Sequence, residues 1–354
     1  MSTQRKDPSI PAGILDFISI DEAINLAEEE INLERTDEQL GLYSSWGGIN
    51  RGMGKYFRFN HITQIAGLSG HGKSYFINQL MDDFTSFKDS FYEDGTLMRK
   101  AVNGNFKGHF LYIHFGFEMD ASDEVLRMTT RRVVKSYHYL LSSEWNNITQ
   151  DFNRIDDYEF ELIKKRMTYL RGRPIIFVPN AGNIASIYRT IAFIRKRHAA
   201  TLGIQPEELH IGVGLDHSFL VKKDVGMTDL LLIQAVAYLA LKIRKDFKAM
   251  VIILGQCNNN LKSIERISDP SVHYPLDSDI YMGAQINWVC DNIWIVFQPH
   301  LVNIVNYGLD KIPTTDLVVA SCVKSRKGKV GDVLLQNLLA EGRYADYSNN
   351  LPKV

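Results

Sequence analysis

One glycine-rich segment constrains this 354-residue chain more than any other feature. The segment Gly67–Ser74 reads G-L-S-G-H-G-K-S and matches the pattern G-x-x-x-x-G-K-[ST] at every fixed position. An apolar stretch precedes it at Ile62–Ala66, and a helical pattern follows at Ser74–Phe84. A turn of this kind wraps its backbone N–H groups around an anion, and the helix N-terminus adds positive potential. The alternative, a glycine-rich turn that matches by chance, leaves both flanking elements unexplained.

The segment predicts a nucleoside triphosphate site that requires Mg²⁺. Lys73 would reach the β- and γ-phosphates, and the Ser74 hydroxyl would bind the metal ion. The residues expected to surround the nucleotide are Gly67, Leu68, Ser69, Gly70, His71, Gly72, Lys73 and Ser74.

Apolar stretches alternate with helical patterns along most of the chain. This alternation predicts an α/β fold with a mostly parallel central sheet and helices on both faces. Less helix separates the later strands, so we expect an antiparallel edge there. The expected strands are Ile62–Ala66, Phe110–Phe115, Pro174–Val178, His210–Leu215, Met250–Gly255, Asn292–Phe297 and Leu317–Val323. The clearest expected helices are Ser74–Phe84, Asp123–Leu141, Ile184–Ala200 and Asp229–Phe247.

Composition narrows the class of protein. A hydrophobic fraction of 45% and a charged fraction of 23% exclude a disordered or collagen-like chain. The net charge of -1 excludes a protein whose whole surface is basic, but it does not exclude a local basic channel that binds nucleic acid. The three cysteines are widely spaced, which argues against a disulfide framework or a zinc site. No apolar run is long enough to cross a bilayer and no secretory signal is present, so we expect a cytoplasmic protein without membrane contact.

Two carboxylates follow predicted strands. Glu118 comes just after Phe110–Phe115, where it could polarise a water molecule against a γ-phosphate. Asp216 ends His210–Leu215, the position expected for the acidic residue that holds the Mg²⁺ water shell. A solvated or capping glutamate and an ordinary turn aspartate are the alternatives.

Other polar residues also lie at strand ends. Gln256 follows Met250–Gly255, where it could sense the γ-phosphate or simply begin a polar loop. Lys324 and Arg326 follow Leu317–Val323 and lie on the same side of an extended chain. Two adjacent cations could stabilise transition-state charge as an arginine finger does, or they could belong to a solvated hairpin turn.

Together these residues resemble, in order, the motifs of the C-terminal ATPase domain of DnaB-type replicative helicases, a RecA-like family of superfamily four. The resemblance runs from Trp46 to Gln336. It is carried by Gly47-Gly48 before the first strand, the segment Gly67–Ser74, Phe117-Glu118-Met119, Arg127, Asp216, Gln256 with Asn258 or Asn259, Glu265-Arg266, and Lys324-Ser325-Arg326-Lys327-Gly328.

The resemblance implies a RecA-like P-loop ATPase that uses ATP and Mg²⁺ to translocate on single-stranded DNA and unwind duplex DNA during replication. It implies that Glu118 is the catalytic glutamate and that Arg127 lies near the γ-phosphate. Lys324 and Arg326 would reach into the site of the neighbouring subunit. The expected partners are single-stranded DNA, further copies of the chain in a hexameric ring, and a primase or loader.

The chain departs from the family pattern in two places. His217-Ser218-Phe219 replace the family's Tyr-Leu-Gln after Asp216, and residues 1–45 are too few for the usual N-terminal domain. We expect an arm with a linker-type amphipathic helix in residues 1–45, the ATPase domain in 46–345 and a tail in 346–354. A compact helicase from a phage or mobile element would fit. A RecA-like recombinase or recombination mediator and a KaiC-like regulatory ATPase are the alternatives.

Two further expectations concern partners. If the chain forms a ring, the loops after Asp216 and Gln256 would face its pore, and the nearest cations for DNA are Lys222, Lys223 and Lys262. Their alternative is an ordinary solvated loop. Near the N-terminus, Ser19 and Glu22 form a capping-box pattern, and the stripe of Ile20, Ile24, Ala27 and Ile31 could dock on a neighbouring subunit.

Overall fold

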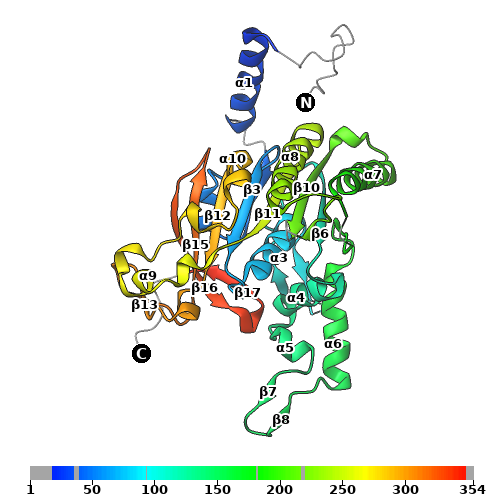
Figure 1. Cartoon of the computed structure of the whole chain (residues 1–354). Coiled ribbons are helices and arrows are strands. Elements are labelled where there is room, and N and C mark those ends of the chain that lie inside the picture. The colour runs from blue at the N-terminus through cyan, green and yellow to red at the C-terminus, as the bar shows by residue number, and fades with distance from the viewer. Residues whose placement is uncertain (1–17, 36–39, 93, 181, 217–219, 348–354) are drawn as a thin grey trace.

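The computed structural model describes residues 18–35, 40–92, 94–180, 182–216 and 220–347, and these build one α/β domain around a nine-stranded sheet (Figure 1). The strand order is β17-β16-β15-β12-β3-β11-β10-β6-β9. The strands of this sheet are β3 (Ile62–Gly67), β6 (His109–Gly116), β9 (Ile175–Phe177), β10 (Leu209–Asp216), β11 (Met250–Gln256), β12 (Asn292–Phe297), β15 (Leu317–Ser325), β16 (Gly331–Leu338) and β17 (Arg343–Asp346).

The sheet is parallel in its larger part and antiparallel at one side, as expected. β12, β3, β11, β10, β6 and β9 pair in parallel, whereas β15, β16 and β17 pair antiparallel. The physical reason lies in the connections. Helices link the parallel strands, but only short turns and the small β13–β14 hairpin (Asn306–Tyr307 and Ile312–Pro313) lie between β12 and β15.

Helices cover both faces of the sheet, which confirms the expected layers. Buried residues of α7, α8 and α10 form one apolar core with the sheet, and those of α2 and α3 form a second core on the opposite face. The helices are α1 (Ile20–Arg35), α2 (Gly47–Gly52), α3 (Lys73–Phe84), α4 (Ala121–Val133), α5 (Tyr137–Leu140), α6 (Asp157–Met167), α7 (Ile184–Leu202), α8 (Asp229–Phe247), α9 (Ile264–Ser268) and α10 (Ala284–Val289).

Two glycines in β10 have a packing role. An added Cβ atom at Gly212 would lie 2.6 Å from the Tyr112 ring of β6, and one at Gly214 would lie 2.5 Å from the Tyr112 hydroxyl and 3.0 Å from Nδ1 of His114. β10 therefore has glycine at these two positions because the Tyr112 and His114 side chains of β6 occupy the space that a Cβ atom would need.

The long helix expected at Asp123–Leu141 is wrong in one respect. α4 ends at Val133 because Val134 adopts a left-handed conformation, with φ of 53°. A new, short helix α5 then begins, and the Ser136 side chain caps it by accepting the Tyr139 N–H. The helical periodicity continues through this break, so the pattern alone does not reveal it.

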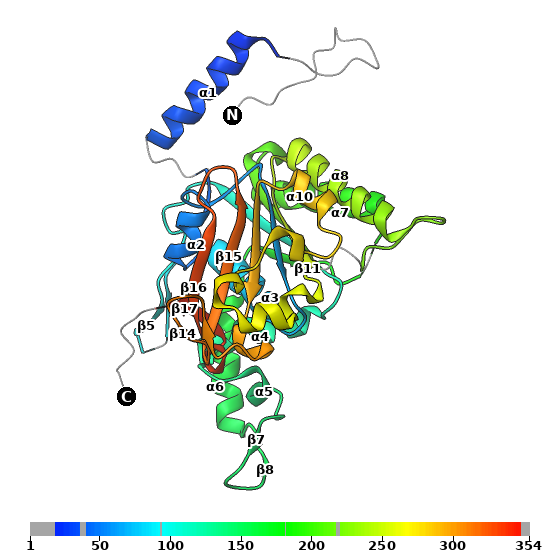
Figure 2. The same cartoon turned by 60° about the vertical axis from the view of Figure 1, so that its left-hand side comes forward.

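Small two-stranded pairs and one protruding helix surround the sheet. The pairs are β1–β2 (Gly41–Leu42 with Phe57–Arg58), β4–β5 (Ser90–Phe91 with Leu97–Arg99) and β7–β8 (Trp145–Asn146 with Asp151–Phe152), and the last of these forms a projecting hairpin. At the opposite side of the molecule α1 stands away from the domain (Figures 1 and 2). Within the described ranges, every helix is too short or too polar to span a bilayer.

The predicted capping box of α1 is present. Ser19 Oγ accepts the Glu22 N–H at 3.1 Å, and Glu22 Oε2 accepts the Ser19 N–H at 2.7 Å. The acidic side of α1 contacts the domain through Glu34, which pairs with Arg58 at 2.6 Å, and through Glu30, which pairs with Lys327 at 3.0 Å. The stripe of Ile20, Ile24, Ala27 and Ile31 is exposed.

Candidate active site

Parallel pairing brings distant residues to one end of the sheet. In the register of the central strands Gln256 lies opposite Gly67, and Asp216 lies opposite Gly116. Glu118 follows two residues after Gly116. The carboxyl ends of β3, β11, β10 and β6 therefore meet along one line, which we call the carboxyl end of the sheet. Ligands of open α/β sheets bind outside this end.

The loop after β3 has the backbone that a phosphate cradle requires. Gly70 and Gly72 both have positive φ values, 78° and 87°, a conformation that favours glycine. Space around Gly70 is open, whereas a Cβ atom at Gly72 would lie 1.9 Å from the Tyr344 hydroxyl. Gly72 then precedes α3, which begins at Lys73. A helix N-terminus behind a glycine-rich turn is the arrangement that binds phosphate groups.

Lys73 lies across this loop. Its Nζ donates hydrogen bonds to the carbonyl oxygens of Gly67 and Leu68, each at 2.9 Å. Burial lowers the pKa of Lys73, while the nearby Glu118 and Asp216 carboxylates act in the opposite direction. The ammonium group is therefore desolvated and lies within electrostatic reach of Glu118, the predicted catalytic carboxylate, and of Asp216, the predicted metal-associated carboxylate.

His71 holds the loop in place. Its ring is buried and stacks on Phe297 with an interplanar angle of 4°, and Nδ1 accepts the Gln298 N–H at 3.1 Å. Burial, together with the charges of Lys262 and Lys73, lowers the pKa of His71 to about 4. His71 is thus a neutral acceptor at pH 7 and ties the phosphate loop to the end of β12.

Asp216 has the properties of a cation ligand. The residue is 2% exposed, and burial raises its pKa to about 6. Among the described residues, no hydrogen-bond donor reaches its Oδ2. Such a carboxylate fits a divalent cation, because a bound ion would supply the missing partner. Asp216 and the Ser74 hydroxyl would hold Mg²⁺. Residues 217–219, where the sequence departs from the family, lie outside the described residues.

A buried pair beside Asp216 was missed by the sequence analysis. Ligand atoms of His114, Glu124 and Asp216 all lie within 4.8 Å of one another. Glu124 also accepts a hydrogen bond from Asn78 Nδ2 of α3 at 2.7 Å. The sequence signal for His114 and Glu124 was weak: a histidine within an apolar strand, and a glutamate in the first turn of a helix.

Glu118 precedes α4, and Arg127 lies within its second turn. Glu118 is exposed at the carboxyl end of the sheet, where its side chain can approach a bound nucleotide. The Arg127 guanidinium lies over the Tyr75 ring at 4.7 Å and over the Tyr137 ring at 5.3 Å. Because Tyr75 follows Ser74 directly, Arg127 is held close to the first turn of α3. Its place near a γ-phosphate stays a prediction.

Gln256 is fixed by its backbone. Its carbonyl oxygen accepts the Tyr281 N–H at 2.8 Å, and the next residue, Cys257, bridges to Ile280. The segment between them is anchored by Arg266, which pairs with the buried Asp279 at 2.6 Å. The side chain of Gln256 is half-buried beside the phosphate loop.

The predicted finger residues lie elsewhere. Arg326 pairs with Asp291 at 3.1 Å, and Asp291 in turn accepts the backbone N–H of Ile62, the first residue of β3. Lys324 Nζ donates to the Asn287 carbonyl at 2.5 Å. Both cations therefore lie at the amino end of the sheet. The six residues of β3 place this end about 20 Å from the phosphate loop of the same chain.

The lysines predicted to contact DNA are all exposed. Lys223 pairs with Asp229 at 2.6 Å, and Lys222 precedes it in the same loop before α8. Lys262 lies near enough to His71 to lower its pKa, so it is close to the phosphate loop. Their contact with DNA stays a prediction.

No protein-family model and no curated protein matches the sequence. Solved structures do match the fold. One of them, the structure of an ATPase domain, matches with a TM-score of 0.70 and 16% sequence identity, over 94% of this chain and 100% of that chain. A DnaB-like replicative helicase, described with its interactions with primase, matches with a TM-score of 0.66 and 18% identity, over 94% of this chain and 68% of that chain. The chain therefore has the RecA-like fold of a DnaB-type helicase ATPase domain, as the motif order indicated.

Proposed function

We propose that this protein is an ATP-dependent DNA helicase or translocase of the DnaB-like type that works as a closed ring of identical subunits. One observation carries the proposal: the phosphate loop and the predicted finger lie at opposite ends of the same sheet. Arg326 is 53% exposed and about 20 Å from the Gly67–Ser74 loop of its own chain. A second subunit placed head to tail would bring Arg326 to the site that lacks it.

Head-to-tail contacts are heterologous, so they either close into a ring or extend as a filament. The exposed apolar stripe of α1 supports an additional contact between subunits. Glu34 and Glu30 of this helix pair with Arg58 and Lys327 of the same chain, and Ile24 and Ile31 stay exposed. We expect six subunits in the ring, stabilised by ATP and Mg²⁺. Each subunit would consist of the arm, the ATPase domain and the tail that the sequence predicts.

Each residue of the site would then have a defined role. The Lys73 ammonium would leave the carbonyls of Gly67 and Leu68 and neutralise the β- and γ-phosphates. Ser74 and Asp216 would hold Mg²⁺, which supplies positive charge against the developing charge on the phosphates. Glu118 would accept a proton from the attacking water, and Gln256 would sense the γ-phosphate. Arg326 and Lys324 of the neighbouring subunit would stabilise the transition state.

ATPase turnover with and without single-stranded DNA tests the proposal, together with unwinding of a forked duplex. A motor should hydrolyse ATP faster when single-stranded DNA is present and should separate the fork. For variants of basic residues, the matched control is Lys196→Ala, because Lys196 is an exposed lysine on α7. Turnover that is indifferent to DNA would instead favour a regulatory ATPase. Stimulation without unwinding, on filaments seen by electron microscopy, would favour a recombinase or mediator.

A further inference from the structure

A cavity of 410 Å³ lies between α3, α4 and β17. Its wall is rich in arginine, with Arg99 from β5, Arg131 and Arg132 from the end of α4, and Arg343 from β17. The loop Gly67–Ser74 contributes no part of this wall. Along α3, the wall residue Gln79 lies six residues after Lys73, about 9 Å along the helix from the phosphate loop. Tyr344 lies between the two sites, since it lines the cavity and its hydroxyl is 3.4 Å from the Gly72 carbonyl oxygen.

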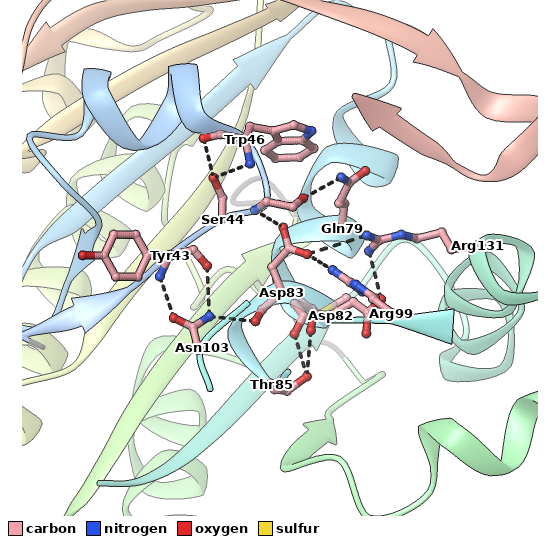
Figure 3. Close-up of polar contacts among 12 residues, drawn as sticks. Tyr43, Ser44, Trp46, Gln79, Asp82, Asp83, Thr85, Arg99, Asn103 and Arg131 are labelled. Carbon is pink, nitrogen blue, oxygen red and sulfur yellow. Dashed lines mark hydrogen bonds and ion pairs between the residues drawn. The ribbon is translucent and has the colours of Figure 1, made fainter. Parts of the chain in front are cut away.

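Two buried aspartates lie behind the arginines, at the end of α3. Asp82 and Asp83 are fully buried, and Arg99 bridges both of them (Figure 3). Arg131 pairs with Asp82 at 2.9 Å and with Asp83 at 3.6 Å. Arg132 pairs with Asp82 at 2.8 Å, and Arg173 lies 4.0 Å from the same carboxylate. Four guanidinium groups therefore share two carboxylates.

Other groups compensate this surplus only in part. Both α3 and α4 end here, and each helix C-terminus contributes roughly half a negative charge. About one positive charge is left over in the buried cluster, and the exposed Asp346 at the rim adds a carboxylate that accepts the Gly47 N–H at 2.9 Å. At the mouth, Glu341 is occupied by Arg343, which it meets at 2.8 Å.

The positive charge of the cluster affects the pKa of one of its arginines. Burial and then repulsion by Arg99 lower the pKa of Arg131 to about 10, although Asp82 and Asp83 act against this. The buried Nε atom of Arg132 has no hydrogen-bond partner within the described part of the chain. An anion in the cavity would supply both the missing acceptor and the missing negative charge.

The chemistry of the wall favours phosphate. Planar guanidinium groups offer paired N–H donors that match phosphate oxygens. The cavity is larger than a bare phosphate ion and falls within the range of small-molecule sites. Trp46, Tyr92 and Tyr344 supply the aromatic part of its wall. We propose that this cavity binds the phosphate group of a small phosphorylated molecule, at a site separate from the phosphate loop. The proposal does not depend on the proposed motor function.

Thermal unfolding with increasing inorganic phosphate, at constant ionic strength, tests this site in four proteins. In the wild-type chain and in Lys73→Ala, we expect saturating phosphate to raise Tm by roughly 2–5 °C. In Arg131→Gln, we expect at least a tenfold weaker response. In chloride alone its Tm should equal or exceed the wild-type Tm, because the charge surplus is relieved. The matched control is Arg197→Gln, an exposed arginine of α7, which should respond like the wild-type chain.

A second variant keeps the test decisive if Arg131→Gln fails to fold. Arg343 is exposed at the rim, so Arg343→Glu should fold normally and also lose the phosphate response. A response that disappears in Lys73→Ala but survives in Arg131→Gln and Arg343→Glu would assign phosphate binding to the Gly67–Ser74 loop and overturn the proposal. The absence of any response in the wild-type chain would overturn it as well.

Discussion

The two ends of the central sheet differ in how their buried carboxylates are partnered. At the carboxyl end, burial shifts each of three groups toward its neutral form: the pKa values of Lys73 and His71 are lowered, and that of Asp216 is raised. At the amino end, the buried Asp291 is fully partnered. It pairs with Arg326 at 3.1 Å and Arg244 at 3.4 Å, and accepts the Ile62 N–H at 2.8 Å.

The difference indicates that the carboxyl end is the better candidate for a ligand site. Charged groups that are buried without compensation are costly and are typical of sites that bind ions or react. The carboxyl end has such groups and an open loop. The amino end is complete in itself, yet it presents Arg326 to solvent. The comparison predicts that one end hydrolyses the nucleotide and that the other end assists a neighbouring subunit.

The largest expected effect tests the carboxyl end. Lys73→Ala should abolish ATP hydrolysis, because among the described residues Lys73 is the cation that lies across the loop and can neutralise the β- and γ-phosphates. Steady-state phosphate release measures this, with Lys196→Ala as the control and circular dichroism to verify folding. Turnover at the wild-type rate in folded Lys73→Ala would contradict the assignment of the loop.

The next effect tests the amino end. Arg326→Ala should reduce hydrolysis by roughly 10³-fold, the lower range for loss of an arginine finger. If Arg326 acts on the neighbouring subunit, mixing Arg326→Ala with Lys73→Ala subunits should restore part of the activity. Such mixed rings contain some interfaces in which both the loop and the finger are intact. Co-assembly without any recovery would contradict action between subunits.

A smaller effect separates catalysis from binding at the carboxyl end. Glu118→Gln should bind ATP normally but hydrolyse it at least ~100-fold more slowly, the usual contribution of a general base. Equilibrium binding of a fluorescent ATP analogue and single-turnover hydrolysis measure the two steps. Equal losses in both would make Glu118 a structural residue.

The pKa shifts predict opposing effects of pH on stability in the protein without ligand. The pKa of His71 is about 4 in the folded chain, below its ordinary value, so its contribution to stability is lost as pH falls from 6.5 to 4. The pKa of Asp216 is about 6, above its ordinary value, so its contribution is lost as pH rises from 4 to 6. Each contribution amounts to about 3 kcal/mol.

Single variants separate these two contributions. Between pH 4 and 6, the free energy of unfolding of His71→Gln should fall with rising pH, and that of Asp216→Asn should rise. The wild-type chain should vary less than either variant. Urea unfolding at several pH values measures all three, and parallel profiles would show that neither group is shifted as described.

The smallest effect concerns DNA. Replacing Lys222 and Lys223 by alanine should lower the slope of log K against log salt for single-stranded DNA by roughly 0.7 for each lost phosphate contact. The Lys223 contribution should be smaller, because Asp229 already pairs with it. An unchanged slope would place this loop away from the DNA path.

The sequence by itself determined the local features of this protein. The loop Gly67–Ser74 is one contiguous motif, so its spacing and flanking elements define it before any folding. The alternation of apolar strands and helices likewise predicted the layers and the antiparallel side of the sheet, because both depend on periodicity and connection length.

Only the tertiary structure decided what depends on register and burial. The pairing of β10 with β6 places Asp216 beside His114 and Glu124, residues that no local pattern connects. The left-handed Val134 divides a helix whose apolar periodicity continues unbroken. The distance of about 20 Å between Arg326 and the phosphate loop follows from the direction of β15 against β12. Side-chain types and spacing carry no information about such distances, since these are set by how strands align across the sheet.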